Sequence, residues 1–308
     1  ASQRLALAKL ESENATLSAS LPHVVDADLL VAGNAVAPTS GTLMSIVGGL
    51  TGLTITTALG GGDAVNTWLI AGAAVFHVLA SIIATRIPVQ LLGPDHPSRR
   101  TLWDVFAWLL SGIRHLRAHP RAARAIATVS MHRMGFGGAT LLTLILMRNA
   151  FHTVDEANEA LQQFSIAIGF AGGGAFIGAL LTPPLSDRLG VVRWARLVLF
   201  VAAVTIAAGY LYGVWKAPST GAFVAILIGA TAIGFAGQCV KISSDSVVQT
   251  TIDDAFRGRV FALYDMSLNI GIIIGTALAA YLLPPSGQSA VYVCLLASTV
   301  ALASAIKN

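Results

Sequence analysis

Charge is what this sequence has least of: only 11% of its 308 residues are Asp, Glu, Lys or Arg, whereas soluble domains carry about 25%. Hydrophobic residues make up 55%, and 30 residues are Gly. Such a composition is typical of helical membrane proteins, in which small residues let helices approach closely. The sequence therefore predicts that most of the chain is surrounded by lipid and not by water.

Further absences exclude several classes of function. The only cysteines, Cys239 and Cys294, both fall inside predicted spans, so a disulfide framework is not expected. The sequence has no glycine-rich loop ending in Gly-Lys, which excludes an internal ATPase motor, and no nucleophile–base arrangement can be picked out. The net charge of +4 comes from clustered Arg and not from a basic stripe, which argues against nucleic acid as a partner. We expect no enzyme activity, no cofactor and no metal.

Apolar stretches close to 20 residues long follow one another along the chain, each closed by a short polar turn. About 20 helical residues span roughly 30 Å, the thickness of the hydrocarbon core of a bilayer. The sequence predicts an all-α polytopic bundle with spans at residues 36–59, 67–87, 123–147, 164–185, 195–215, 220–242, 260–283 and 288–306. We expect an integral membrane protein that crosses the bilayer eight times.

Lys and Arg gather in alternate connections, which the positive-inside bias places in the cytoplasm. These connections carry Arg99, Arg100, Arg114, Arg117, Arg121 and Arg124; Arg188, Arg193 and Arg196; and Lys241, Arg257 and Arg259. The intervening connections include the acidic region with Asp155, Glu156 and Glu159. The alternation predicts a protein of the plasma membrane with both termini in the cytoplasm.

The connection at 88–122 has a helix pattern of its own. Its apolar residues recur at helical spacing, at Leu102, Phe106, Leu109, Leu110, Ile113 and Leu116. Such a helix is amphipathic and is expected to rest on the membrane surface. The chain then divides into a cytoplasmic segment at 1–35, two spans at 36–87, this linker at 88–122 and a six-helix bundle at 123–308.

A weak internal repeat relates the first predicted span to the seventh. Val25-Asp26, continuing to Gly48, matches Ile252-Asp253, continuing to Gly275, at a constant offset. Parallel repeats of this kind relate the two bundles of one large class of transporters. The repeat predicts that the first two spans are the last two of an N-terminal half.

Three motifs resemble those of a known family. Residues 178–193 read GALLTPPLSDRLGVVR, residues 248–263 read VQTTIDDAFRGRVFAL, and residues 21–36 read LPHVVDADLLVAGNAV. In these motifs the chain resembles the major facilitator superfamily, and within it the bacterial multidrug, macrolide and enterobactin exporters. The first motif is similar to the cytoplasmic signature of the superfamily, with Gly178, Asp187, Arg188, Gly190 and Arg193 in the matching places.

The resemblance implies twelve helices in two halves that rock about a central site. Eight spans then correspond to the last eight, and the first four helices are expected to be missing from this chain. Residues 48–52 read GGLTG where proton-coupled drug exporters tend to carry a Gly-Pro pair, so Gly49 stands in the place of that proline.

Ionisable groups inside a span cost about 3 kcal/mol each, so they are candidates for function. His132 and Arg133 lie together in the third span and could handle substrate or protons, or form a structural ion pair. Asp265 and Asn269 share one face of the seventh span; they could line a cavity, or Asp265 could pair with Arg257, Arg259 or Lys241. The remaining pathway candidates are Gln238, a polar neighbour, and His77, for which helix packing is the favoured interpretation.

The cytoplasmic charges are candidates for a gate, because charged helix ends can pair in one conformation and separate in another. The gate candidates are Gly178, Asp187, Arg188, Gly190 and Arg193 after the fourth span, and Asp253, Arg257, Gly258 and Arg259 before the seventh. Topology anchoring would explain the same charges. His115 and His119 have the i, i+4 spacing of metal ligands, but no third ligand is expected nearby and the helix is a surface one, so no metal site is expected.

We therefore expect a secondary active transporter, a proton-coupled exporter of a small amphipathic compound that works by alternating access. Its expected partners are the lipid bilayer, the small-molecule substrate and protons as the coupling ion. Two alternatives remain open: an importer of the same superfamily, and a non-transporting membrane fragment or scaffold subunit that needs a partner.

Overall fold

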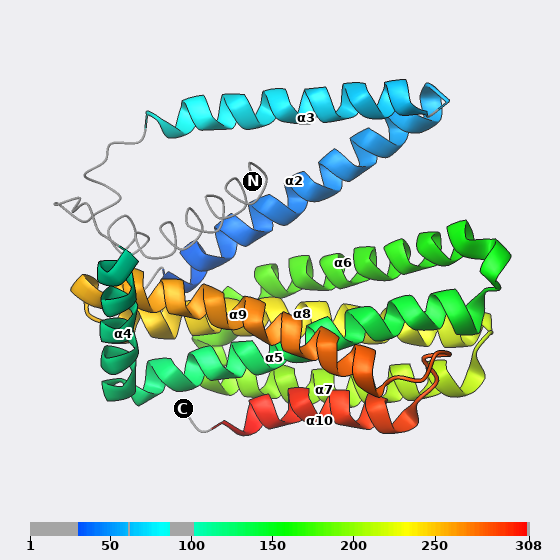
Figure 1. Cartoon of the computed structure of the whole chain (residues 1–308). Coiled ribbons are helices and arrows are strands. Elements are labelled where there is room, and N and C mark those ends of the chain that lie inside the picture. Colours follow the sequence, from blue (N-terminus) through cyan, green and yellow to red (C-terminus); the bar gives the residue numbers. More distant parts are fainter. Residues whose placement is uncertain (1–29, 61, 87–101, 307–308) are drawn as a thin grey trace.

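The computed structural model describes residues 30–60, 62–86 and 102–306, and all regular structure in these ranges is helical (Figure 1). The elements are α2 (Leu30–Ala58), α3 (Asp63–Ala84), α4 (Leu102–Ala118), α5 (Pro120–Leu146), the π-turn η3 (Met147–Phe151), the 3-10 turn η4 (Val154–Glu156), α6 (Ala157–Leu189), α7 (Val191–Lys216), α8 (Thr220–Thr251), α9 (Asp254–Leu282) and α10 (Ala290–Ala305). The prediction of an all-helical chain is confirmed.

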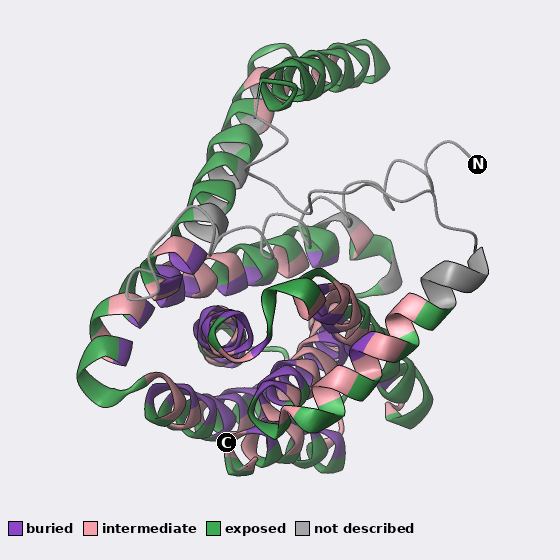
Figure 2. Cartoon of the chain, turned by 90° about the vertical axis from the view of Figure 1, so that its left-hand side faces the viewer, coloured by how far each residue is buried: buried purple, intermediate pink, exposed green. Residues whose placement is uncertain are grey.

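Helices α5 to α10 form one antiparallel bundle, and the α2–α3 hairpin stands beside it (Figure 1). Within the bundle α5 packs along α9, while α8 packs along both α6 and α7. The buried side chains gather inside the bundle, whereas the hairpin is exposed along most of its length (Figure 2). No residue of α3 is buried.

Small residues set the closest helix contacts. Gly275 of α9 lies against the backbone carbonyl of Met134 on α5, and Gly234 of α8 lies against that of Ala171 on α6. A side chain at either position would collide with backbone, which cannot move aside. Small-residue packing, which the glycine content predicts, therefore operates at these contacts, whereas Gly169 and Gly173 of α6 face open space.

Six helices of the described part are long and apolar enough to cross a membrane. They are Asp63–Ala84, Pro120–Phe151, Glu159–Leu189, Val191–Lys216, Thr220–Thr251 and Asp254–Leu282. The first and last predicted spans coincide with α2 and α10, whose apolar stretches, Val47–Thr56 and Ala290–Ala305, are shorter. All eight predicted spans are thus helices, and six have the length and hydropathy of a complete span.

Two predicted loop boundaries are wrong, because the helices run further than their apolar stretches. Helix α6 continues through Pro183 and Pro184 to Leu189, so the turn before α7 is the single residue Gly190, whose φ of +83° favours glycine. Helix α8 runs to Thr251 and α9 starts at Asp254. Lys241 therefore lies inside a helix and not in a turn.

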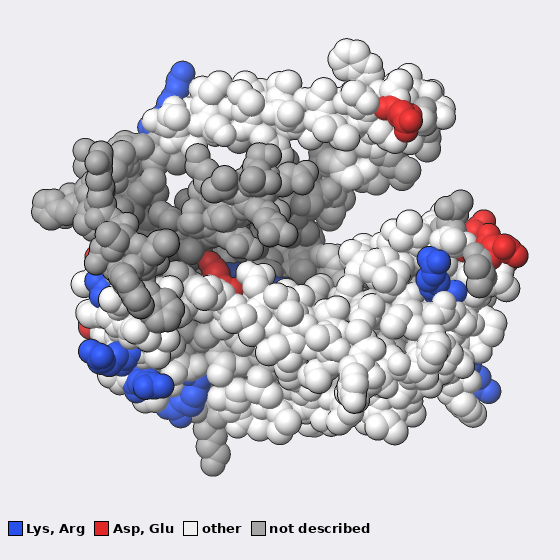
Figure 3. Space-filling model, in the orientation of Figure 1, with Lys and Arg blue, Asp and Glu red and all other residues white. Residues whose placement is uncertain are grey.

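The ionic side chains gather at the two ends of the bundle (Figure 3). The Arg-rich end, as we call it, carries Arg114, Arg117, Arg188 and Arg193, and the acidic end carries Asp155, Glu156 and Glu159. The three Arg-bearing connections lie at the same end because α4, the α6–α7 turn and the α8–α9 turn all meet there (Figure 1).

Helix α2 contacts the bundle only near the Arg-rich end and then diverges from it (Figure 1). The side chains of Asn34 and Gln249 exchange two hydrogen bonds, of 2.6 and 3.1 Å, and both residues are buried. Ala35 packs beside them against Ala179 and Ile242. Between the hairpin and the bundle is a hollow that opens toward the acidic end (Figure 3).

The predicted linker helix is present as α4, which lies across the Arg-rich end of the bundle (Figure 1). It packs against α9, where Gly112 meets Arg259 and Leu263. The acidic turn at Val25-Asp26, on which the internal repeat depends, lies outside the described residues, so the repeat stays a prediction.

Candidate substrate pathway

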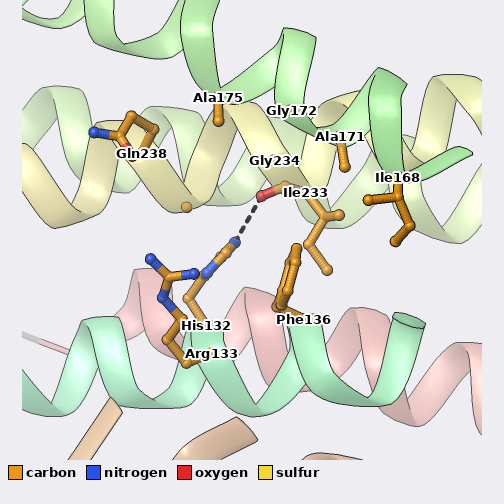
Figure 4. Close-up of a pocket in the computed structure, with 11 residues that line it drawn as sticks. His132, Arg133, Phe136, Ile168, Ala171, Gly172, Ala175, Ile233, Gly234 and Gln238 are labelled. Carbon is orange, nitrogen blue, oxygen red and sulfur yellow. Dashed lines mark hydrogen bonds between the residues drawn. The ribbon is translucent and has the colours of Figure 1, made fainter. Parts of the chain in front are cut away.

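A cavity of about 210 Å³ lies between α5, α6 and α8 (Figure 4). Its lining residues are His132, Arg133, Phe136, Ile168, Ala171, Gly172, Ala175, Ile233, Gly234, Gly237 and Gln238. Arg133 follows the start of α5 by 13 residues, which corresponds to roughly 20 Å of helix and places it near the middle of the span. Three of the six predicted pathway residues, His132, Arg133 and Gln238, meet in this cavity.

His132 joins two helices. Its Nε2 lies 3.0 Å from the backbone carbonyl of Ile233 on α8, and its ring fills the space that a side chain at Gly237 would need. The side chain is fully buried, with 1% exposed. His132 therefore joins α5 to α8 through a backbone carbonyl and not through an ion pair, and its part in a pathway stays a prediction.

Arg133 brings a cation to the cavity. Its guanidinium carbon lies 5.8 Å from the centre of the Phe136 ring, and no carboxylate of the described residues lies within 4.0 Å of it. Gln238 of α8 is also among the residues that line the cavity. A guanidinium and an amide in an otherwise apolar wall can orient the polar part of a ligand.

An ionic cluster that was not predicted begins three residues after Gln238. On α8, Lys241 Nζ lies 2.7 Å from Asp245 Oδ2, and only 4% of the Asp245 side chain is exposed. The Lys241 ammonium also lies 5.7 Å from the centre of the ring of Tyr264, which is buried on α9. The i, i+4 spacing of Lys241 and Asp245 was the available signal, but Lys241 was assigned to a turn.

Asp265 and Asn269 do not reach the cavity. Asp265 is half-buried on α9, and Asn269 is exposed and donates its side-chain amide to the Asp265 carbonyl at 3.1 Å. Of the three cations considered as partners of Asp265, Arg257 pairs with Asp254, Lys241 pairs with Asp245 and Arg259 donates to Ser111, all at 2.7 Å.

His77 is exposed on α3, where its Nδ1 lies 2.9 Å from the carbonyl of Ala73 in the same helix. No residue of α3 is buried in the described structure, so the interpretation of His77 as a helix-packing residue stays a prediction.

The first group of gate candidates lies where α6 ends and α7 begins. Gly178 packs inside, because a Cβ atom there would lie 2.7 Å from the carbonyl of Phe235 on α8. Asp187, Arg188 and Arg193 are exposed, and they form no ion pair with one another. Gly190 makes the turn. The charges are therefore available to a partner at the Arg-rich end.

The second group lies at the start of α9 and contacts α4. Arg259 donates to the Ser111 hydroxyl on α4, and its guanidinium carbon lies 4.6 Å from the centre of the Phe256 ring. Asp253 faces His115 of α4, with 3.5 Å between Oδ2 and Nε2. Arg257 pairs with Asp254 one turn away, and Gly258 faces open space.

This contact also changes the metal prediction. The donor atoms of His115, His119 and Asp253 all lie within 4.8 Å of one another. The premise that no third ligand is near the two histidines is therefore wrong, because Asp253 comes from a distant part of the sequence.

Comparison with known proteins gives the family. Residues 126–306, more than half of the chain, match the Major Facilitator Superfamily. Uncharacterized MFS-type transporters of Mycobacterium bovis and Mycobacterium tuberculosis are each 32% identical over 296 residues, which cover 94% of this chain and 64% of theirs. The chain thus spans less than two thirds of the length of these relatives.

A solved structure has a similar fold. The outward-facing crystal structure of a bacterial homologue of the iron transporter ferroportin aligns with a TM-score of 0.57 and 16% identity, covering 92% of this chain and 65% of that one. Together with the apolar helices, the family match indicates a multi-pass membrane protein. This chain belongs to the major facilitator superfamily of membrane transporters.

Proposed function

We propose that the chain belongs to a proton-coupled exporter that carries a small amphipathic compound across the plasma membrane by alternating access. The observation that carries the proposal is the cavity with Arg133 in its wall, because a cation at that depth of a membrane bundle typically marks a substrate or ion pathway.

The cavity supports an amphipathic substrate. Its walls are apolar except for His132, Arg133 and Gln238. The volume of about 210 Å³ is smaller than the roughly 300–1,000 Å³ of sites that enclose a drug-sized ligand. In this proposal the six-helix bundle therefore provides one wall of the site, and helices of the N-terminal half, of which α2 and α3 are the last two, provide the other.

Asp245 is the group that we propose for proton coupling. Its carboxylate is almost fully buried and is neutralised by Lys241 alone among the ion pairs of the described residues. Protonation of Asp245 would leave the Lys241 ammonium without its partner, and the pair would have to rearrange. A buried pair with two charge states can bias two arrangements of its helices.

The contact between Asn34 and Gln249 supports alternating access. It joins α2 to α8 at the Arg-rich end, while the hairpin and the bundle stand apart toward the acidic end (Figure 3). With the Arg-rich end in the cytoplasm, as the positive-inside bias indicates, this arrangement faces outward. Rocking of the halves would break the amide pair, and a partner for Asp187, Arg188 and Arg193 would come from the opposite half.

A dye-efflux measurement tests the proposal. Cells that express the exporter to which we assign the chain are loaded with Nile red, a small amphipathic dye, with and without a protonophore. We expect less dye in these cells than in vector controls, and no difference once the protonophore is present. Arg133→Ala removes the effect, Asp245→Asn removes its dependence on the proton gradient, and Arg148→Ala, an exposed Arg at the acidic end, keeps the parent behaviour.

Other outcomes refute the proposal at different points. More dye in expressing cells would favour the importer. No difference between expressing and control cells would refute export of this compound class by the chain and would favour the scaffold alternative. Orientation is tested separately by single cysteines at Arg114 and Arg188, which an impermeant thiol reagent should label only from the cytoplasmic side.

A further inference from the structure

The contact between α4 and the start of α9 holds one histidine ring in a fixed position. The ring of His115 stacks on Phe256, with centroids 4.1 Å apart and planes 3° from parallel, and its other neighbour is the ring of His119 at 4.2 Å. Only 12% of the His115 side chain is exposed. The direction of its nitrogen atoms is therefore set by packing.

The nitrogen that faces Asp253 has no hydrogen-bond partner. His115 Nε2 is buried and makes no hydrogen bond within the described structure, and the Asp253 oxygen at 3.5 Å is beyond the range of about 2.7–3.2 Å for a good N–H···O bond. Asp253 is the N-cap residue of α9, yet its side chain makes no cap hydrogen bond. Its carboxylate lies toward His115 instead of accepting a hydrogen bond from the first turn of α9.

The separation suits a shared ion. Two ligands of a tetrahedral ion with bonds of about 2.0–2.1 Å lie roughly 3.3–3.4 Å apart, close to the observed 3.5 Å. In His119, Nδ1 lies 2.9 Å from the His115 carbonyl. Such a bond fixes the tautomer of a metal-binding imidazole and leaves Nε2 for the ion.

One cation lies close to these donors. Arg259 acts on His115 and opposes a bound cation, although its guanidinium is bonded to Ser111, so we expect a site of moderate affinity.

We propose that His115, His119 and Asp253 form a binding site for a divalent transition-metal ion of the Zn²⁺ type, with water completing the coordination. Two histidines at i, i+4 on one helix and a carboxylate from another are a donor set that such ions prefer over Mg²⁺ or Ca²⁺. The ion would join the linker helix α4 to the first turn of α9, a contact separate from the substrate cavity.

Metal titration of the chain in lipid nanodiscs tests this site. The chain is titrated with Zn²⁺ by calorimetry and with Co²⁺ by visible absorption, whose intensity reports the coordination geometry. We expect one saturable site that Mg²⁺ does not displace. His119→Ala and Asp253→Asn should each weaken binding by about 10-fold or more, since even outer-shell changes cost 10- to 100-fold.

His152→Ala is the matched control, because His152 also lies beside a carboxylate, with Nδ1 3.7 Å from Glu156 at the acidic end. This variant should bind as the parent does. Asp253 is 71% exposed, so Asp253→Asn is expected to fold, which circular dichroism verifies. The proposal is refuted if no saturable site exists, if Asp253→Asn binds like the parent, or if His152→Ala loses the same affinity. Dye efflux plays no part in these readouts, so the site can stand or fall apart from the proposed export.

Discussion

Replacement of Lys241 by Met should destabilise the chain far more than replacement of both members of its ion pair. Lys241 and Asp245 are 2.7 Å apart, and 4% of the Asp245 side chain is exposed. Without the ammonium, the carboxylate is buried with no counter-charge, which costs about 3–5 kcal/mol. Lys241→Met with Asp245→Leu removes both charges at similar volume, and such replacements are often neutral or stabilising.

The two cysteines provide the assay. Cys239 is fully buried on α8 and Cys294 is exposed, so in a Cys294→Ala background a thiol-reactive dye reports unfolding through Cys239 alone. Lys241→Met should unfold at a clearly lower temperature than the parent. The double variant should unfold at a temperature close to that of the parent. Lys216→Met is the control, since that ammonium lies 4.0 Å from the centre of the Trp215 ring, a contact worth about 0.5–1 kcal/mol at an exposed site. Equal midpoints for the single and double variants would refute the reasoning.

Three further predictions concern packing, the α2 contact and acid stability. Gly275→Val should prevent close approach of α5 and α9 and lower the unfolding temperature, whereas Gly173→Val, in open space, should leave it within a few degrees; equal losses would contradict the packing account. Asn34→Ala with Gln249→Ala should weaken the α2 contact by about 1–3 kcal/mol, measured as a longer spin-label distance between α2 and α8, and an unchanged distance would argue against the amide pair. Hydrogen bonds from the backbone amide and then from the side chain of Thr153 lower the pKa of Glu156, so the stability that the Glu156 carboxylate contributes is present at neutral pH and is lost as pH falls through that lowered pKa. The difference in unfolding midpoint between the parent and Glu156→Gln should therefore vanish in acid. A difference that does not depend on pH would exclude this role.

The spans could be predicted from the sequence because the hydropathy of a span is the sum over residues that follow one another in the chain. Hydropathy also placed His132 and Arg133 correctly near mid-span, and both line the cavity with Gln238. It failed where helices extend past their apolar stretches: Lys241 was assigned to the turn before the seventh span, although α8 continues to Thr251. Hydropathy cannot distinguish an ionic pair inside a helix from the charges of a turn.

Contacts between segments that are distant in the chain could not be predicted from the sequence. Nothing near His115 in the chain indicates Asp253, since the two meet only when α4 lies across the first turn of α9. The pairing of Asn34 with Gln249 is equally invisible, because single amides in apolar helices have no periodicity that a pattern can detect.

The narrow attachment of α2 has a mechanical consequence. Its 29 residues measure roughly 44 Å from end to end, and among the described residues the helix meets the bundle near the Arg-rich end. A tilt of about 10° at that attachment would move the far tip by roughly 7–8 Å by the same geometry. Small rearrangements at Asn34 would thus be amplified along the helix into a displacement as wide as a small molecule.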